Sequence, residues 1–205
     1  GPIAVRHLPR VIGTPRTPSS PSDLVLAALG GKWIVQAVST AAKLGIPEAL
    51  ASTPRDSADL ALHLGCHEPS LARLLRVLAT EGFALEDRHG RFELTDAGRF
   101  LRDSELGPLA RFVGSASQWT PWLALDHSIR TGEAAFDHTF GASLFEYLAA
   151  HPEESRLYDA AVDSFTRHEA RALAKLHDWS AYRHVVDIGG GRGTVLVELA
   201  RTFHG

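Results

Sequence analysis

The feature that most constrains the fold lies near the carboxyl end, where a short β-branched run leads into a cluster of glycines. Residues 184–188 read His-Val-Val-Asp-Ile, and residues 189–193 read Gly-Gly-Gly-Arg-Gly. Residues 194–201 then have the apolar spacing of an amphipathic helix. A strand, a glycine loop and a helix in this order begin a Rossmann-like sheet. The sequence therefore predicts the first βα unit of a Rossmann-like α/β domain over residues 181–205.

The spacing of these glycines excludes two kinds of phosphate-binding loop. Glycine leaves room for a ligand beside the backbone, and the following helix directs its free N–H groups and positive dipole end at that ligand. A dinucleotide fingerprint is excluded because Thr194 stands at its third glycine position, and a P-loop because no Gly-Lys-Ser/Thr follows. Three glycines alternate after an acid, from Asp187 to Gly193, which resembles the first motif of class I methyltransferases. Taken alone, the pattern indicates a loop for S-adenosylmethionine, a loop for a nucleotide cofactor, or a tight structural turn.

Two predicted helices lie in the first half of the chain. Asp56 or Ser57 caps a helix that ends at Gly65. Pro69 suits the first turn of a second helix, which Gly82 ends. The apolar face of this second helix follows the i, i+3, i+4, i+7 pattern in Leu71, Leu74, Leu75 and Leu78.

A predicted hairpin follows these helices. Residues 87–90, Asp-Arg-His-Gly, form a turn between two short strands. Large apolar side chains stand at every second position on both sides of it, at Phe83 and Leu85 before the turn and at Phe92 and Leu94 after it. Thr95 with Asp96 caps the next helix. Two helices followed by a hairpin form a winged helix-turn-helix, which we predict for residues 22–103.

A long apolar helix is predicted at residues 24–42, where Lys32 is the one charged residue and Ser22-Asp23 offers an N-cap. The glycines and polar residues within it, such as Gly30, Gly31 and Gln36, favour a buried helix over a membrane span. A helix that is apolar on most sides needs cover on most sides, and a small domain alone hardly provides it. We therefore expect a homodimer through this domain, with a second short helix near residues 47–51.

Residues 104–180 read as a mostly helical linker. Pro152 begins a helix whose apolar residues include Leu157, Tyr158, Ala161, Val162 and Phe165. Two aromatic clusters precede it, one of Trp119 and Trp122 and the other of Phe136, Phe140, Phe145 and Tyr147. Each aromatic residue by itself suits an ordinary core. As a group beside a glycine loop they suit a flat aromatic ligand, so we expect this linker to line a substrate pocket.

Charge argues against nucleic acid and membranes as partners. The net charge is −3 and the pI is about 6.4, whereas phosphate-binding surfaces are basic. Residues 56–103 hold six Arg and nine Asp or Glu, which favours dimerisation over DNA reading for the winged helix. Cys66 is the one cysteine, so no internal disulfide can form, which fits the cytoplasm. Its neighbours His63 and His67 lack the paired spacing of a structural zinc site, and we expect no metal.

The two ends of the sequence suggest a flexible tail and an incomplete chain. Residues 1–21 hold five of the eleven prolines and no secretory signal, which predicts a flexible tail. The chain has no methionine and stops just after the first predicted βα unit. We therefore expect a piece of a longer protein or one half of a split enzyme.

Four stretches, taken in order, resemble the S-adenosylmethionine-dependent O-methyltransferase family of the dimeric, plant-type and polyketide-tailoring class. They are residues 45–50 (GIPEAL), 71–78 (LARLLRVL), 130–136 (RTGEAAF) and 186–193 (VDIGGGRG). The resemblance covers roughly residues 22–205 and is greatest to the mitomycin and anthracycline methyltransferases. It implies an enzyme of secondary metabolism that methylates a hydroxyl of an aromatic or polyketide-type small molecule.

The resemblance also implies roles for individual residues. The residues that would contact S-adenosylmethionine are Asp187, Gly189, Gly190, Gly191 and Gly193, with Arg156 from the preceding helix. The residues that would wall the acceptor are Trp119, Trp122, Tyr158, Val162 and Phe165. This sequence departs from the family at two places: Val162 stands where methionine is frequent, and the spacing from Arg156 to Gly189 is about one residue shorter than in some relatives.

Two functional groups of the family fall outside these residues. One is the acid about 20 residues past the glycine loop that binds the ribose hydroxyls, and the other is a downstream histidine that acts as the general base. His177 lies in a similar His-Asp-Trp string but comes ten residues before Asp187, so we read it as structural and assign no catalytic residue. We expect the full-length protein to use direct displacement on an oriented acceptor, and the 205 residues alone to be inactive.

Two other functions stay open at this point. A relative of these enzymes could use the bound cofactor for hydroxylation, decarboxylation or cyclisation. A winged-helix dimer could also act as a regulator without catalysis.

Overall fold

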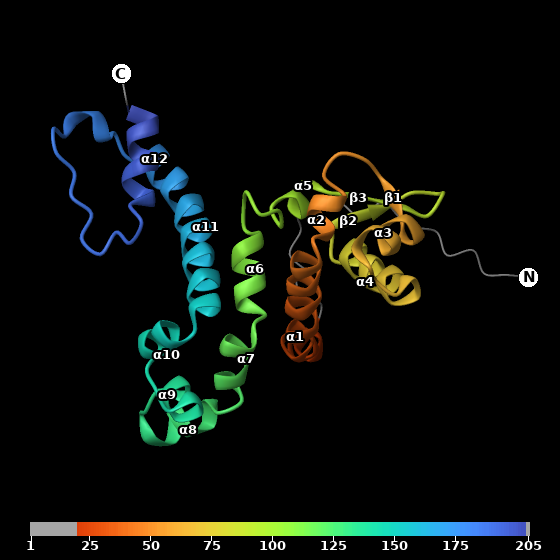
Figure 1. Cartoon of the computed structure of the whole chain (residues 1–205), viewed down its shortest axis with the longest axis horizontal. Coiled ribbons are helices and arrows are strands. Elements are labelled where there is room, and N and C mark those ends of the chain that lie inside the picture. The colour runs from red at the N-terminus through yellow and green to blue at the C-terminus, as the bar shows by residue number, and fades with distance from the viewer. Residues whose placement is uncertain (1–19, 204–205) are drawn as a thin grey trace, which may run out of the picture.

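The computed structural model describes residues 20–203, which are mainly helical with one small antiparallel sheet. The chain is extended in Figure 1, with α1 to α5 and the sheet on one side and α11 with α12 on the other. Helix α6 (Gly107–Val113) lies between them and packs on both α1 and α11. The tail predicted at residues 1–21 falls almost wholly outside the described residues.

Helix α1 (Pro21–Leu44) is longer than predicted because its cap lies earlier in the chain. Ser20, and not Ser22-Asp23, is the N-cap: its Oγ accepts a hydrogen bond from the Asp23 amide at 3.2 Å. Pro21 takes the first position, where its missing N–H costs nothing. Gly45, at φ 73°, ends the helix.

The two ends of α1 differ in burial. Near Ser39, Ala41 and Ala42 the helix is buried, whereas its first turns are open. The side chains of Leu24, Val25, Leu26, Leu29 and Trp33 are 58–70% exposed. The length and composition of α1 would also allow a membrane span, but a core helix of a soluble protein meets the same criteria. The burial predicted for the whole helix is therefore found at its carboxyl half within this chain.

The predicted helix pair is present. Helix α2 (Ile46–Ala49) is followed by α3 (Ser57–Leu64) and α4 (Glu68–Thr80). Asp56 caps α3, accepting from the Asp59 amide at 2.8 Å. Gly65 ends that helix at φ 66°, as expected of a C-terminal glycine.

The predicted hairpin is also present. Strands β1 (Arg55–Asp56), β2 (Ala84–Glu86) and β3 (Arg91–Leu94) form an antiparallel sheet in the order β1-β3-β2. Ala84 is buried, whereas Leu85 is 47% exposed. The register explains this, because Leu85 pairs with the exposed Glu93 and Ala84 pairs with the buried Leu94.

One hydrophobic core joins these elements. Its fully buried members include Ala41, Ile46, Leu60, Leu75 and Phe92. Thr95 caps the short helix α5 (Asp96–Arg99) with a 3.0 Å bond from the Gly98 amide. Gly98 lies directly against the Phe83 carbonyl, where an added Cβ would come within 1.9 Å of the oxygen. The chain therefore closes this core tightly before α6 begins.

The helical linker is as predicted. After α6 come α7 (Ala116–Trp122), α8 (Leu125–Thr131), α9 (Ala135–Phe140) and α10 (Leu144–Ala150). The rings of Phe136, Phe140 and Tyr147 pack with centroids 4.7–5.5 Å apart. The long helix α11 (Pro152–Leu176) follows and runs beside α6.

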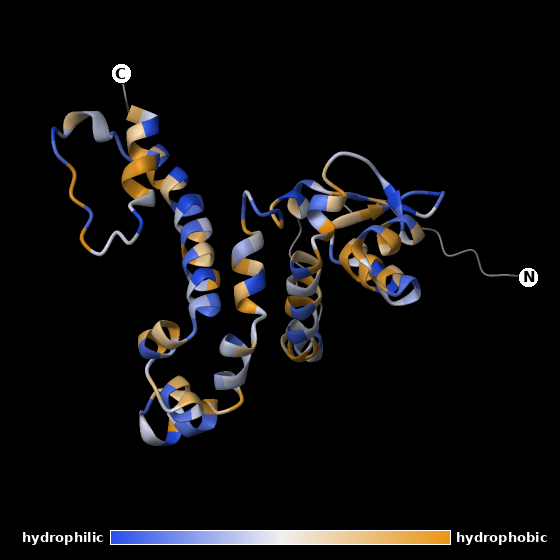
Figure 2. Cartoon of the chain, viewed as in Figure 1, coloured by the Kyte–Doolittle hydropathy of each residue, from blue (hydrophilic) through white to orange (hydrophobic). Residues whose placement is uncertain are grey.

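The predicted strand at residues 184–188 is absent. After the short 3-10 helix η1 (Trp179–Ala181), the chain runs without regular structure to α12 (Thr194–Phe203), which packs on α11. Figure 2 shows apolar residues along this loop, which stands away from the helices. Ile188 is 94% exposed, and none of the strands in residues 20–203 lies beside it. A strand satisfies its backbone only through a neighbouring strand, so the β-branched run by itself did not suffice.

Candidate cofactor site

The glycine loop forms a compact turn that begins α12. The Gly193 amide donates to the Gly190 carbonyl at 2.8 Å, and the Val197 amide donates to the Gly193 carbonyl at 3.0 Å. Gly189, Gly191 and Gly193 all have positive φ, between 52° and 80°. Residues other than glycine rarely adopt this backbone conformation, so the path of the loop requires glycine at these three positions.

The Asp187 carboxylate packs on the backbone of this turn. A Cβ at Gly190 would lie 2.4 Å from Asp187 Oδ2, so any other residue there would require the Asp187 side chain to move. That oxygen is buried and has no hydrogen-bond partner in residues 20–203. A buried carboxylate oxygen without a partner is costly, which makes it an acceptor available to a ligand.

A pocket of about 440 Å³ lies between the glycine loop and α11. Its volume is within the range of small-molecule sites. Its walls include, of the residues predicted for the site, Asp187, Gly189, Gly190, Gly191, Tyr158 and Val162. Gly193 follows directly at the start of α12. The structure therefore brings the predicted cofactor loop and two predicted substrate residues into one cavity.

The same pocket contains residues that sequence reasoning missed. They are Asp159, Asp163, Thr166, Arg192, Thr194 and Val195. Three of them could have been found from the helical period, because Asp159, Asp163 and Thr166 share a face of α11 with Tyr158 and Val162. Phe145 on α10, a member of the second predicted aromatic cluster, also lines this pocket.

Five predicted residues do not line this pocket, one of them being Gly193, which lies just before α12. Arg156 and Phe165 fall at opposite margins of the pocket-facing side of α11, at about 100° per residue. The Arg156 guanidinium instead forms an ion pair with Glu153, with 3.9 Å between Nη2 and Oε1. Trp119 is partly buried within α7, with an indole N–H that has no partner in residues 20–203. Trp122 is exposed and lines a separate open hollow of α7 and α8 with Leu123, Leu125, Asp126, Ile129 and Arg130.

His177 also lies away from the pocket. Its ring packs against Trp179 and Tyr182, with centroids 5.0 Å and 5.6 Å away. The hydroxyl and the amide of Ser180 donate hydrogen bonds to the Asp178 carboxylate. These bonds hold the pKa of that carboxyl below its usual value. Within the described part of the chain, no set of three His, Cys, Asp or Glu side chains could hold a metal.

Comparison with known proteins gives the family. A family model described as an O-methyltransferase dimerisation domain matches residues 26–104, and one described as an O-methyltransferase domain matches residues 122–205. A phenazine O-methyltransferase from Lysobacter antibioticus is 35% identical over 184 residues, covering 88% of this chain and 54% of that protein. A mitomycin biosynthesis 6-O-methyltransferase from Streptomyces lavendulae is 35% identical over 202 residues, covering 93% of this chain and 58% of that protein.

Solved structures agree with these matches. The crystal structure of LaPhzM has a TM-score of 0.79 and 35% identity, over 88% of this chain and 55% of that one. The mitomycin 7-O-methyltransferase structure has a TM-score of 0.73 and 34% identity, over 89% of this chain and 55% of that one. The chain spans about half the length of the curated relatives it matches. With two family models that together match most of its residues, the chain belongs to the O-methyltransferase family.

Proposed function

We propose that the protein is an S-adenosylmethionine-dependent O-methyltransferase of which these residues form the dimerisation region and one edge of the cofactor pocket. The observation that carries the proposal is the cavity between the glycine loop and α11, whose lining includes Asp187, a residue with an unpartnered carboxylate oxygen. Solved relatives support the cofactor, since the calicheamicin methyltransferase CalO1 is described as bound to SAH. When bound, S-adenosylmethionine supplies an electrophilic methyl group.

This chain's own residues would bind and orient rather than transfer protons. Asp187 and the glycine loop, with the free N–H groups of the first turn of α12, would hold the cofactor. Tyr158 and Val162 would form the facing wall and exclude water from it. A general base is needed to take the acceptor's hydroxyl proton, and we assign that role to none of the described residues.

We propose an aromatic acceptor of secondary metabolism. The printed names of relatives support this: besides phenazine and mitomycin, one relative is a 2,7-dihydroxy-5-methyl-1-naphthoate 7-O-methyltransferase, 34% identical over 178 residues. An amine acceptor is the second candidate, because an 8-amino-8-demethylriboflavin N,N-dimethyltransferase is 33% identical over 160 residues. Four of the predicted residues that do not line the present cavity would contact a ligand only if the pocket were larger and more closed. They are Arg156, Trp119, Trp122 and Phe165.

We also propose a cytoplasmic homodimer formed through residues 22–103, with residues 104–180 as the linker and 181–205 as the start of the cofactor domain. The exposed apolar turns of α1, with Leu26 and Leu29 one turn apart, support a dimer interface. Leu29→Glu should convert the dimer to monomer in sedimentation equilibrium, because a charge would be buried there. Leu62→Glu, at a leucine on α3 that is 86% exposed against 65% for Leu29, is the control that should leave the dimer intact.

The cofactor proposal is tested by following backbone amide NMR shifts while S-adenosylhomocysteine is added to the chain. Weak binding suffices, and the shifts should be confined to residues 187–194 and to the pocket-facing side of α11. Asp187→Asn should reduce them, whereas Asp126→Asn, in the separate hollow, should not. Shifts of α4 with duplex DNA and none with S-adenosylhomocysteine would instead support a winged-helix regulator.

A further inference from the structure

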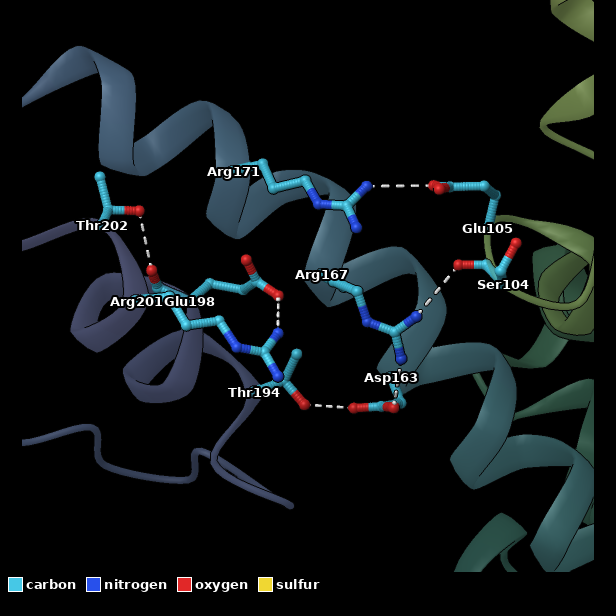
Figure 3. A network of polar contacts seen from close by, with 9 residues as sticks. All are labelled: Ser104, Glu105, Asp163, Arg167, Arg171, Thr194, Glu198, Arg201 and Thr202. Atoms are coloured by element: carbon cyan, nitrogen blue, oxygen red, sulfur yellow. Dashed lines mark hydrogen bonds and ion pairs between the residues drawn. The ribbon is translucent and has the colours of Figure 1, made fainter.

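A chain of polar contacts crosses three segments that lie far apart in the sequence (Figure 3). Asp163 on α11 stands at its centre, accepting from the Thr194 hydroxyl on one carboxylate oxygen and from Arg167 at 2.9 Å on the other. Arg167 also donates to the Ser104 carbonyl, at 3.2 Å, between α5 and α6. The Asp163 carboxylate, together with Arg167, thus connects the start of α12, the middle of α11 and the segment between α5 and α6.

The position of Thr194 makes the first of these contacts important. Thr194 is the first residue of α12 and follows Gly193, the last residue of the glycine loop. Its bond to Asp163 is the one side-chain hydrogen bond that joins residues 182–203 to the rest of the described chain. Because residues 184–188 have no neighbouring strand, this bond and the packing of α12 on α11 hold the loop in place.

The environment of Asp163 strengthens the contact. The side chains of Asp163 and Arg167 are 25% and 29% exposed, so solvent screens the ion pair less than at an open surface. Asp163 also lines the cofactor pocket beside Tyr158 and Val162 on the same face of α11. The residue that ties down the loop is therefore part of the wall that the loop faces.

We infer that Asp163 is a positioning residue that holds the glycine loop against α11 and so sets the shape of the cofactor pocket. Arg167 holds the carboxylate in its orientation towards Thr194 and connects it to the Ser104 carbonyl. The inference rests on the proposed function only for the identity of the ligand in the pocket. The holding of the loop can be measured without any ligand.

The same pair of segments offers a matched control. Arg171, one turn after Arg167 on α11, donates to Glu105 at 3.1 Å (Figure 3). This ion pair also ties α11 to the segment before α6 but makes no contact with Thr194. Breaking it tests whether any loss of an ion pair on α11 disturbs the loop.

The experiment is amide hydrogen exchange in the ligand-free chain, read at Gly193 and Val197. Both amides donate within the loop and the first turn of α12, so their exchange reports local opening. Thr194→Val removes the hydroxyl and should raise exchange at both sites about tenfold, as expected for a lost hydrogen bond to a charged group. Thr194→Ser keeps the hydroxyl and should restore slow exchange, and Arg171→Gln should leave it slow.

A double-mutant cycle adds a second measurement. Asp163→Asn should raise exchange at Gly193 and Val197, and its effect should shrink when Thr194 is already valine, because the two side chains act through one bond. Thermal unfolding of each variant shows whether the fold is kept. Equal exchange in the wild type and Thr194→Val, or full additivity of the two substitutions, would overturn the inference.

A titration with S-adenosylhomocysteine separates this inference from the proposed function. If both hold, Thr194→Val weakens the amide shifts in the loop and Thr194→Ser restores them. If the wild type shows no shifts while Thr194→Val still speeds exchange, the cofactor proposal fails and the positioning role stands. If the wild type shows shifts that Thr194→Val leaves unchanged, with exchange unchanged too, the positioning role fails and the cofactor proposal stands.

Discussion

Two segments of the chain carry equally clear strand patterns, yet only one of them forms a strand. Phe92 in β3 is 1% exposed, whereas Ile188 in the run before the glycine loop is 94% exposed. The hairpin supplies β3 with a partner across a short turn, and β1 pairs with its other edge. Residues 184–188 have no strand within reach among the described residues. A sequence pattern therefore marks the capacity for a strand, and the availability of a neighbour decides whether the strand forms.

The largest expected effect compares these two segments directly. Phe92→Ala should lower the free energy of unfolding by about 3–5 kcal/mol, because it leaves a cavity in a fully packed core. Ile188→Ala should change it by less than about 0.5 kcal/mol, because that side chain is exposed. Urea unfolding followed by circular dichroism measures both. A large loss for Ile188→Ala would mean that residues 184–188 are covered in solution, and the comparison would break.

The next effect concerns close packing at Gly98. Gly98→Ala should destabilise the protein by about 1–3 kcal/mol or more, since the added Cβ meets the Phe83 carbonyl oxygen and the backbone must shift. Gly31→Ala, in the open part of α1, meets nothing within 4 Å. There alanine should be neutral or stabilising by up to about 1 kcal/mol, as helix propensity predicts. The same unfolding measurement applies, and equal effects of the two substitutions would contradict the tight closure of the core.

The smallest effect is the pH dependence of the hairpin turn. The Asp87 carboxylate accepts hydrogen bonds from the Arg91 amide at 3.0 Å and the His89 amide at 2.8 Å. These bonds, the one from Arg91 first, lower the pKa of Asp87 to about 2 from a usual 3.8. Because the folded-state pKa is the lower one, the stabilisation is present above about pH 4 and is lost as the pH falls towards 2.

An NMR titration of the Asp87 carboxyl carbon measures this pKa. Asp87→Asn should remove that part of the pH dependence of unfolding between pH 2 and 4. Asp96→Asn is the control, because Asp96 lies in the next helix and takes no part in the turn. A pKa near 4 for Asp87 would show that the turn is open in solution.

Much of the helical structure was predictable because helices close their hydrogen bonds locally. Asp56, Gly65 and Thr95 were each found where their side chain or backbone conformation suits a helix end. The cap of α1 was misplaced by two residues, since three serines and an aspartate near residue 20 all suit the role. The face that Leu85 occupies could not be predicted, because a three-residue strand gives too short a pattern to set the register.

The candidate site was predictable in part. The glycine loop and Asp187 lie at the pocket, as predicted. They could be predicted because the residues that let a ligand approach the backbone are adjacent in the sequence. Tyr158 and Val162 lie there too, whereas Trp119, Trp122, Arg156 and Phe165 do not line it. Their expected roles came from the resemblance to the family, and the positions of side chains around a pocket depend on how distant helices pack.

The sequence by itself determined the family, the helix ends, the hairpin turn and the backbone path of the glycine loop. Each of these depends on residues close together in the chain, where propensity and hydrogen bonding act locally. Tertiary structure alone decided that Asp163 meets Thr194, that α6 joins α1 to α11, and that the run at residues 184–188 pairs with no strand among residues 20–203. Contacts across 31 residues depend on the packing of whole helices, and a strand depends on a neighbour that no local pattern provides.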